Sequence, residues 1–163
     1  WNNYPKVEHF KVEYLSENKK LFFEDKNYLA YGLGRSYGDV CLNDNGHIVV
    51  TTEHNKIYKI DVENGLLNCE SGVSIKEILD IITPMGWFLP VVPGTRNVTI
   101  GGAIANDIHG KNHHKVGSLG NHISRILLIM FYNFHLLVVI KDVQAWVKFL
   151  CVVFLMVVIK ISH

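Results

Sequence analysis

The sequence predicts an α+β fold, because strand-like segments come first, one amphipathic helix follows them, and glycine-rich loops come next. The 163 residues are enough for one domain with a hydrophobic core of its own. With 48% hydrophobic and 19% charged residues, the composition is that of a globular protein rather than a disordered one. The net charge of +1 gives no basic surface, so we expect no nucleic-acid partner.

Five short strands are predicted first, over Val7–Leu15, Tyr28–Leu33, Ile48–Thr52, Ile57–Ile60 and Leu66–Glu70. The first alternates apolar and polar residues, as a half-buried strand does, and the third is rich in β-branched residues. The last two form a predicted hairpin, because the Asn-Gly pair in Asp61–Gly65 is a strong turn signal.

One helix is predicted over Ser74–Met85, where apolar residues recur at helical spacing. Ser74 as the N-cap and Glu77 three residues later complete a capping box. A proline and a glycine mark the end of this helix. We expect a short apolar strand next, over Phe88–Val92, interrupted by Pro90.

The residues after Gly120 differ from the rest, because all 13 glycines and all 4 prolines lie at or before that position. The longest apolar run, Phe149–Ile159, is eleven residues long. A membrane-spanning helix needs about 20 apolar residues, so we expect a buried strand here and no membrane span.

Two glycine-rich loops, Tyr31–Cys41 and Pro93–Gly120, are the most informative parts of the sequence. Glycine lacks a Cβ, so it permits tight turns and close approach of the backbone to a ligand. The first loop contains neither a Rossmann fingerprint nor a Walker motif, and a simple turn between strands is the alternative reading. Its backbone N–H groups, with Ser36 and Arg35, could bind phosphate oxygens. Both loops together fit one extended anionic ligand, such as a dinucleotide.

The second loop also carries His109, Lys111, His113 and His114. Asp107 stands close enough in sequence to orient the His109 ring and to support its cationic form. A structural histidine is the alternative reading. His109 and His113 are four residues apart, but the loop has no HExxH motif and no expected helix, so we predict no metal.

Cys41, Cys69 and Cys151 are three cysteines at wide spacing without a CxxC pair, which favours a reduced intracellular chain. We expect a cytoplasmic or membrane-peripheral protein. The chain begins at Trp1 rather than at a Met, so we also expect it to be a piece of a longer protein.

Three blocks carry a resemblance to a known family, and they read GLGRSYGD, IDVENGLLNCESGVSIKEIL and PVVPGTRNVTIGGAIANDIHGKNHHKVGSLGNHI. They resemble the FAD-binding half of the vanillyl-alcohol-oxidase (PCMH-type) flavoproteins. The DIHGKNHH block is specific to the branch of the decaprenylphosphoryl-β-D-ribose oxidases and their bacterial relatives. The resemblance covers Trp1–Ile129, and it leaves residues 130–163 as an apolar segment at the end of the same domain.

The resemblance implies a fold of two small α/β subdomains that clasp FAD, with the substrate domain missing. It implies that FAD is held noncovalently by Tyr31, Gly32, Leu33, Gly34, Arg35, Ser36, Tyr37, Gly38, Asp39, Val40, Cys41, Gly94, Thr99, Ile100, Gly101, Gly102, Asn106, Asp107, Ile108 and His109. No catalytic residue is assigned, and His109 and Lys111 are the candidates on the substrate side.

The resemblance also implies a function. Members of this branch are FAD-dependent oxidoreductases that oxidise the 2-hydroxyl of a polyprenyl-phosphate-linked ribose in cell-wall arabinose-donor synthesis, with a partner reductase completing the epimerisation. They are more than twice as long as this chain, so we expect the chain alone to lack turnover. A non-catalytic FAD- or dinucleotide-binding fragment is the alternative.

Where the family has a glycine-rich turn near the end of the FAD domain, this sequence has valines within Cys151–Val158. Positive φ is costly for β-branched residues, so we expect a truncated or altered segment there.

Overall fold

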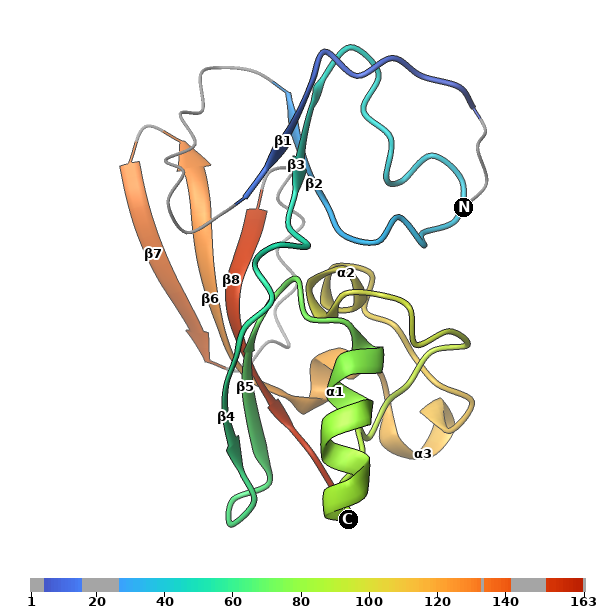
Figure 1. Cartoon of the computed structure of the whole chain (residues 1–163), viewed down its shortest axis with the longest axis vertical. Helices are drawn as coiled ribbons and strands as arrows, with labels where there is room; N and C mark the ends of the chain where they lie inside the picture. Colours follow the sequence, from blue (N-terminus) through green and yellow to red (C-terminus); the bar gives the residue numbers. More distant parts are fainter. Residues whose placement is uncertain (1–4, 16–26, 133, 142–151, 163) are drawn as a thin grey trace.

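The polypeptide forms two lobes, and the strands of the larger one reach along the long axis to the level of the smaller one (Figure 1). The computed structural model describes residues 5–15, 27–132, 134–141 and 152–162. Within these ranges we call residues 5–51 the small lobe and residues 57–162 the large lobe, and residues 52–56 are the linker between them. Each lobe is built on one β-sheet, and helices pack on the larger sheet, so the predicted α+β class is confirmed.

Three parallel strands form the sheet of the small lobe in the order β1-β3-β2, and they are β1 (Lys11–Tyr14), β2 (Tyr28–Tyr31) and β3 (His47–Val50). All of β3 is buried, as the central strand of a parallel sheet should be. The first strand is shorter than the predicted Val7–Leu15. Single hydrogen bonds from Phe10 to Gly46 (2.8 Å) and from Leu15 to Val50 (2.8 Å) extend its pairing by one residue at each end.

Five antiparallel strands form the sheet of the large lobe in the order β4-β5-β8-β6-β7. They are β4 (Ile57–Asp61), β5 (Leu66–Glu70), β6 (Ile123–Tyr132), β7 (Phe134–Lys141) and β8 (Val152–Lys160). The predicted hairpin is confirmed as β4 and β5. Gly65 closes its turn at φ 61°, a conformation that glycine adopts without strain.

The segment with valines in place of the expected glycines is not a turn. Val152–Lys160 is strand β8, which pairs with β5 on one side and with β6 on the other. Val157 and Ile159 are fully buried in the core. β-branched residues suit a pleated, buried strand, so the buried strand expected within Phe149–Ile159 is confirmed in its described part, from Val152 onward.

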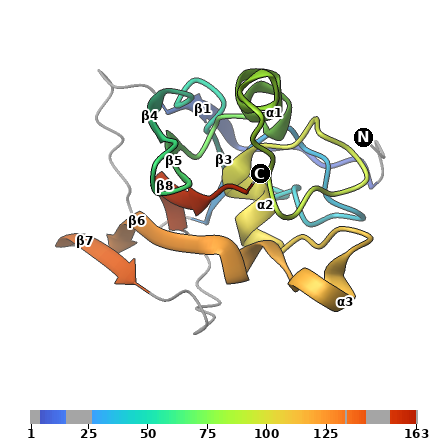
Figure 2. The ribbon, with the colours of Figure 1, turned by 90° about the horizontal axis from the view of Figure 1, so that it is seen from below.

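The helices lie on one face of the large sheet, as the two views show (Figures 1 and 2). They are α1 (Ile75–Ile82), α2 (Ile100–Ala105) and α3 (His113–Val116), with the 3₁₀ helices η1 (Thr83–Met85) and η2 (Leu119–His122). The predicted helix is confirmed as α1 and η1. Its capping box is also confirmed, because the Ser74 Oγ accepts from the Glu77 N–H and the Glu77 carboxylate accepts from the Ser74 N–H.

The second glycine-rich loop contains two short helices that the sequence did not predict. Thr99 caps α2 by accepting a hydrogen bond from the Gly102 N–H at 3.1 Å, and α3 is a single turn. Two adjacent glycines disfavour a helix intrinsically, and here packing overrides that preference.

The predicted strand Phe88–Val92 is wrong, because only Phe88 pairs, through an isolated bridge to Ser162. Pro90 has no N–H to donate to a ladder, so regular pairing cannot continue past it.

The main core lies between the large sheet and the helices. It is formed by residues that share nearly complete burial, among them Leu67, Cys69, Ile75, Ile78, Ile82, Ile100, Ile104, Leu119, Val157 and Ile159. Burial raises the pKa of the Cys69 thiol to about 12. Because the core joins side chains of the sheet with side chains of α1 and α2, it holds both helices against the sheet. Helix α2 carries one half of the candidate site.

Candidate functional site

The two glycine-rich loops meet where the lobes face each other. Gly32, directly after β2, lies so close to Thr99 that a Cβ at Gly32 would collide with the Thr99 side chain. Thr99 is buried and precedes α2 in the large lobe. The loop after β2 therefore begins in direct contact with the N-terminus of α2, and both loops border one inter-lobe region (Figure 1).

The first loop combines special backbone geometry with free donors. Gly34 has φ 60° and Gly38 has φ 62°, a region that side chains disfavour. Among the described residues, nothing lies within 4 Å of the position that a Gly38 Cβ would take, so they leave this backbone open to a ligand. Within the described part of the chain, the backbone N–H groups of Ser36 and Gly38 donate no hydrogen bond. Arg35 is exposed and donates to the Leu33 carbonyl at 2.6 Å.

The first turn of α2 has no free backbone donors. The Ile100 N–H donates to Val73 at 2.7 Å, the Gly101 N–H donates to Ser71 at 2.8 Å, and Thr99 accepts from the Gly102 N–H. Ile100 and Gly101 are buried, so they hold the helix rather than face a ligand. The first turn of α2 therefore cannot donate hydrogen bonds to a ligand, and what it can contribute is a surface that a ligand approaches closely.

Gly101 and Gly102 differ in what surrounds them. A Cβ at Gly101 would stand 2.9 Å from the Ser71 Cβ, whereas a Cβ at Gly102 would meet only the Thr99 Oγ1, at 3.0 Å. Among the described residues, nothing lies within 4 Å of the Cβ position of Gly94, which is exposed. Gly94 is thus an open glycine of the second loop, Gly102 has a single close side-chain neighbour, and Gly101 is a packing glycine.

The residues after α2 form a connected turn. The Asn106 side chain donates to the Gly102 carbonyl at 2.8 Å. Asp107 has φ 40°, and its carboxylate accepts from the Gly120 N–H at 2.9 Å rather than from a histidine. The Ile108 N–H donates to Ala103 at 3.0 Å. The expectation that Asp107 orients the His109 ring is therefore replaced by a structural role for this carboxylate.

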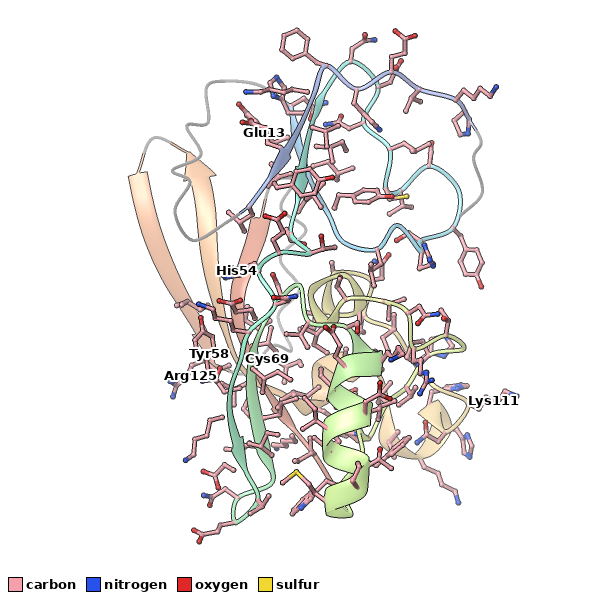
Figure 3. All side chains as sticks on the ribbon, viewed as in Figure 1. Glu13, His54, Tyr58, Cys69, Lys111 and Arg125 are labelled. Atoms are coloured by element: carbon pink, nitrogen blue, oxygen red, sulfur yellow. The ribbon has the colours of Figure 1, made fainter. Side chains whose placement is uncertain are left out.

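The histidines gather around α3 at the surface. The ring of His113 lies 5.0 Å from that of His109 and 5.9 Å from that of His114, measured between centroids. All three are exposed, and Lys111 points outward at the edge of the large lobe (Figure 3). Among the described residues, no group of three His, Cys, Asp or Glu side chains could hold a metal ion.

The donor set of the first loop fits a pyrophosphate. The free N–H groups of Ser36 and Gly38, the Ser36 hydroxyl and the Arg35 guanidinium are the donors that phosphate oxygens accept from. Among the described residues, the open backbone at Gly38 and Gly94 leaves room for an extended ligand. The remaining residues of the first loop, Leu33, Tyr37, Asp39, Val40 and Cys41, are exposed or half-buried and follow the same surface.

Sequence reasoning did not single out Ser71, whose buried Oγ has no hydrogen-bond partner among the described residues. It also missed Glu70 and the linker. No local motif marks these residues, because their contacts join segments that are far apart in the sequence.

The chain is similar in sequence to known proteins. The family model described as "FAD binding domain" matches residues 22–130. The chain is 45% identical over 104 residues to decaprenylphosphoryl-beta-D-ribose oxidase of Mycolicibacterium smegmatis, and 32% identical over 92 residues to D-lactate dehydrogenase of Archaeoglobus fulgidus. These matches cover 64% and 56% of this chain, but only 23% and 20% of the two relatives.

A solved structure of a cholesterol oxidase variant from Brevibacterium sterolicum has a similar fold. Its TM-score is 0.67 at 15% identity, and the match covers 85% of this chain and 30% of that chain. In the described part of this chain, no helix has both the length and the apolar character needed to cross a bilayer.

Proposed function

The chain belongs to the FAD binding domain family, and on that premise we propose that it is the FAD-holding part of an oxidoreductase that acts on a CH–OH group. FAD is the cofactor that the family match indicates. The observation that carries the proposal is the contact of Gly32 with Thr99, because it brings two loops with open backbone together from opposite lobes.

The residues of this chain have separate tasks in the proposal. The N–H groups of Ser36 and Gly38, with Arg35, hold the pyrophosphate and neutralise part of its charge. Gly102 lets the ligand approach α2 closely, since a side chain there would occupy the space in front of the helix. When FAD is bound, it supplies the electron-accepting chemistry, and the protein supplies binding, orientation and exclusion of water.

We propose a lipid-linked sugar as the substrate class, with oxidation at the 2-hydroxyl of a polyprenyl-phosphate-linked ribose. The support is the 45% identity to an enzyme named for that activity, over 64% of this chain. His109 and Lys111 are exposed beside α3 and are the candidates for contacts on the substrate side. A reductase that acts on the keto product would be the partner of such an enzyme.

A second candidate is an FAD-binding module without turnover of its own. The short length of the match favours this second candidate, because the chain spans 23% of the length of the ribose oxidase that it matches. The two candidates share the cofactor site and differ only in whether a substrate reduces the flavin.

The test is an FAD titration of the purified chain, followed by absorbance of the flavin band at about 450 nm during addition of substrate. The proposal predicts binding near one FAD per chain, and no bleaching by any substrate in the chain alone. With the remainder of the ribose oxidase joined to the chain, it predicts bleaching by a polyprenyl-phosphate-linked ribose but not by lactate. Binding without bleaching in that joined protein supports the second candidate. Gly102→Val should abolish binding, whereas Ala105→Val, at an exposed position of the same helix, should not.

A further inference from the structure

Glu70 is a buried carboxylate at the junction of the two lobes, with 1% of its surface exposed. Its Oε1 accepts from the Tyr58 hydroxyl at 2.5 Å, and its Oε2 accepts from the Lys56 N–H at 2.7 Å. The His54 Nε2 lies 3.4 Å from Oε1. Figure 3 shows His54 at the level where the lobes meet and Tyr58 further along β4. All three partners thus come from the segment that leads out of the linker into β4.

The residues after Glu70 join the same linker to the candidate site. The Gly72 N–H donates to the His54 carbonyl at 2.8 Å, and a Cβ at Gly72 would collide with the backbone of the linker. The Ser71 carbonyl accepts from the Gly101 N–H at 2.8 Å. The segment from Glu70 to Gly72 therefore touches the linker on one side and the first turn of α2 on the other.

The small lobe is connected to this network at the start of the first glycine-rich loop. Thr51, the last residue before the linker, donates to the Tyr31 carbonyl through its N–H at 2.9 Å and through its Oγ1 at 3.2 Å. A path of short contacts thus runs from Tyr31 through Thr51 and the linker to Glu70, and from Ser71 to α2.

A buried carboxylate is costly unless hydrogen bonds satisfy it, so the chain around Glu70 has little freedom to move away. We propose that Glu70, held by Tyr58 and His54, is a positioning residue that sets the distance between the two glycine-rich loops and thereby the affinity for FAD. The proposal rests on the proposed function, because it takes FAD as the ligand between the lobes.

Two variants test it by fluorescence titration with FAD. Glu70→Gln leaves one acceptor oxygen for the Lys56 N–H but replaces the other oxygen with an NH2 group, which cannot accept from the Tyr58 hydroxyl, and we expect about a tenfold loss of FAD affinity. Tyr58→Phe removes the hydroxyl that donates to Glu70 from a half-exposed side chain, so it should fold, and we expect about a fivefold loss of FAD affinity. Asp61→Asn is the matched control, since this carboxylate bonds Lys59 and Asn64 near the β4–β5 turn, and its FAD affinity should equal that of the parent.

A second readout separates positioning from stability. Spin labels at the exposed positions Val12→Cys in β1 and Ile81→Cys in α1 report the distance between the lobes, in a background with Cys41→Ser and Cys151→Ser. Without FAD, Tyr58→Phe should broaden this distance distribution, and saturating FAD should narrow it again.

The outcomes are distinguishable. An unchanged distance distribution together with parental FAD affinity in folded Tyr58→Phe would overturn the role of Glu70. A parent that binds no FAD would overturn the proposed function, and broadening in the variant would then still support Glu70 as the residue that fixes the lobes.

Discussion

Gly32 and Thr99 lie in contact across the junction of the lobes, and the Thr99 side chain fills the space that any side chain at position 32 would need. Thr99 cannot rotate away freely, because its hydroxyl accepts the hydrogen bond from the Gly102 N–H that caps α2. This one contact links the backbone of the first loop to the start of the helix that carries the second.

Gly32→Ala should therefore weaken FAD binding about tenfold and lower the free energy of unfolding by about 1–2 kcal/mol. The new methyl group can be accommodated only if the Thr99 hydroxyl releases the Gly102 N–H or if the two lobes move apart. FAD titration and urea denaturation measure the two effects. In a Thr99→Ala background, Gly32→Ala should lower the free energy of unfolding by less than it does in the parent. If the two substitutions lowered the free energy of unfolding additively, the two residues would not be in contact in solution.

Gly101→Ala and Gly102→Ala should differ in their consequences. A methyl group at Gly101 meets the Ser71 Cβ at 2.9 Å and the Ser71 carbonyl oxygen at 3.0 Å, so the fold should lose about 1–3 kcal/mol. At Gly102 the methyl group meets only the Thr99 Oγ1, at 3.0 Å, and the higher helix propensity of alanine offsets part of that crowding, so the fold should lose less than about 1 kcal/mol while FAD affinity falls. Urea denaturation with FAD titration of both variants checks this, and equal FAD affinity in Gly102→Ala and the parent would remove this loop from the site.

Cys69 should make stability depend on pH in the alkaline range. Burial raises the pKa of its thiol from 9.0 to about 12, so the unfolded chain loses this proton first as the pH rises. The contribution is fully present below pH 9 and declines above it by about 1.4 kcal/mol per pH unit until about pH 12. The measurement is the difference in unfolding free energy between parent and Cys69→Ala from pH 8 to 11. A constant difference would mean that the thiol is not buried.

Ser74→Ala should cost about 1 kcal/mol of stability, because it removes the side-chain acceptor for the Glu77 N–H at the start of α1. Thermal or urea unfolding measures this change. Lys76→Ala, at an exposed position of the same helix, serves as the comparison and should change stability by less than about 0.5 kcal/mol. Equal effects of the two substitutions would argue against the capping box.

Local sequence signals predicted the elements that local physics controls. The capping box at Ser74 and the Asn-Gly turn that ends at Gly65 both depend on contacts within a few residues, and both occur in the structure. The two glycine-rich loops were also recognised, since dense glycine marks unusual backbone wherever it occurs.

Features that depend on distant contacts could not be predicted in the same way. The helix α2 contains two glycines and forms because Thr99 caps it and the core packs against it. A buried strand was predicted within Phe149–Ile159, but its position between β5 and β6, which explains its valines, could not be read from the sequence. The role of Glu70 could not be predicted, because it depends on hydrogen bonds from the linker and from β4.

The central claim is that one FAD lies between the lobes, with its pyrophosphate on the first glycine-rich loop. Amide chemical shifts of the ¹⁵N-labelled chain during FAD titration test it most directly. We expect the Ser36, Gly38 and Gly102 signals to shift and saturate together, while those of Asn64 and Gly65 in the β4–β5 turn stay in place. Saturation by FAD without any shift at Ser36 and Gly38 would contradict the claim.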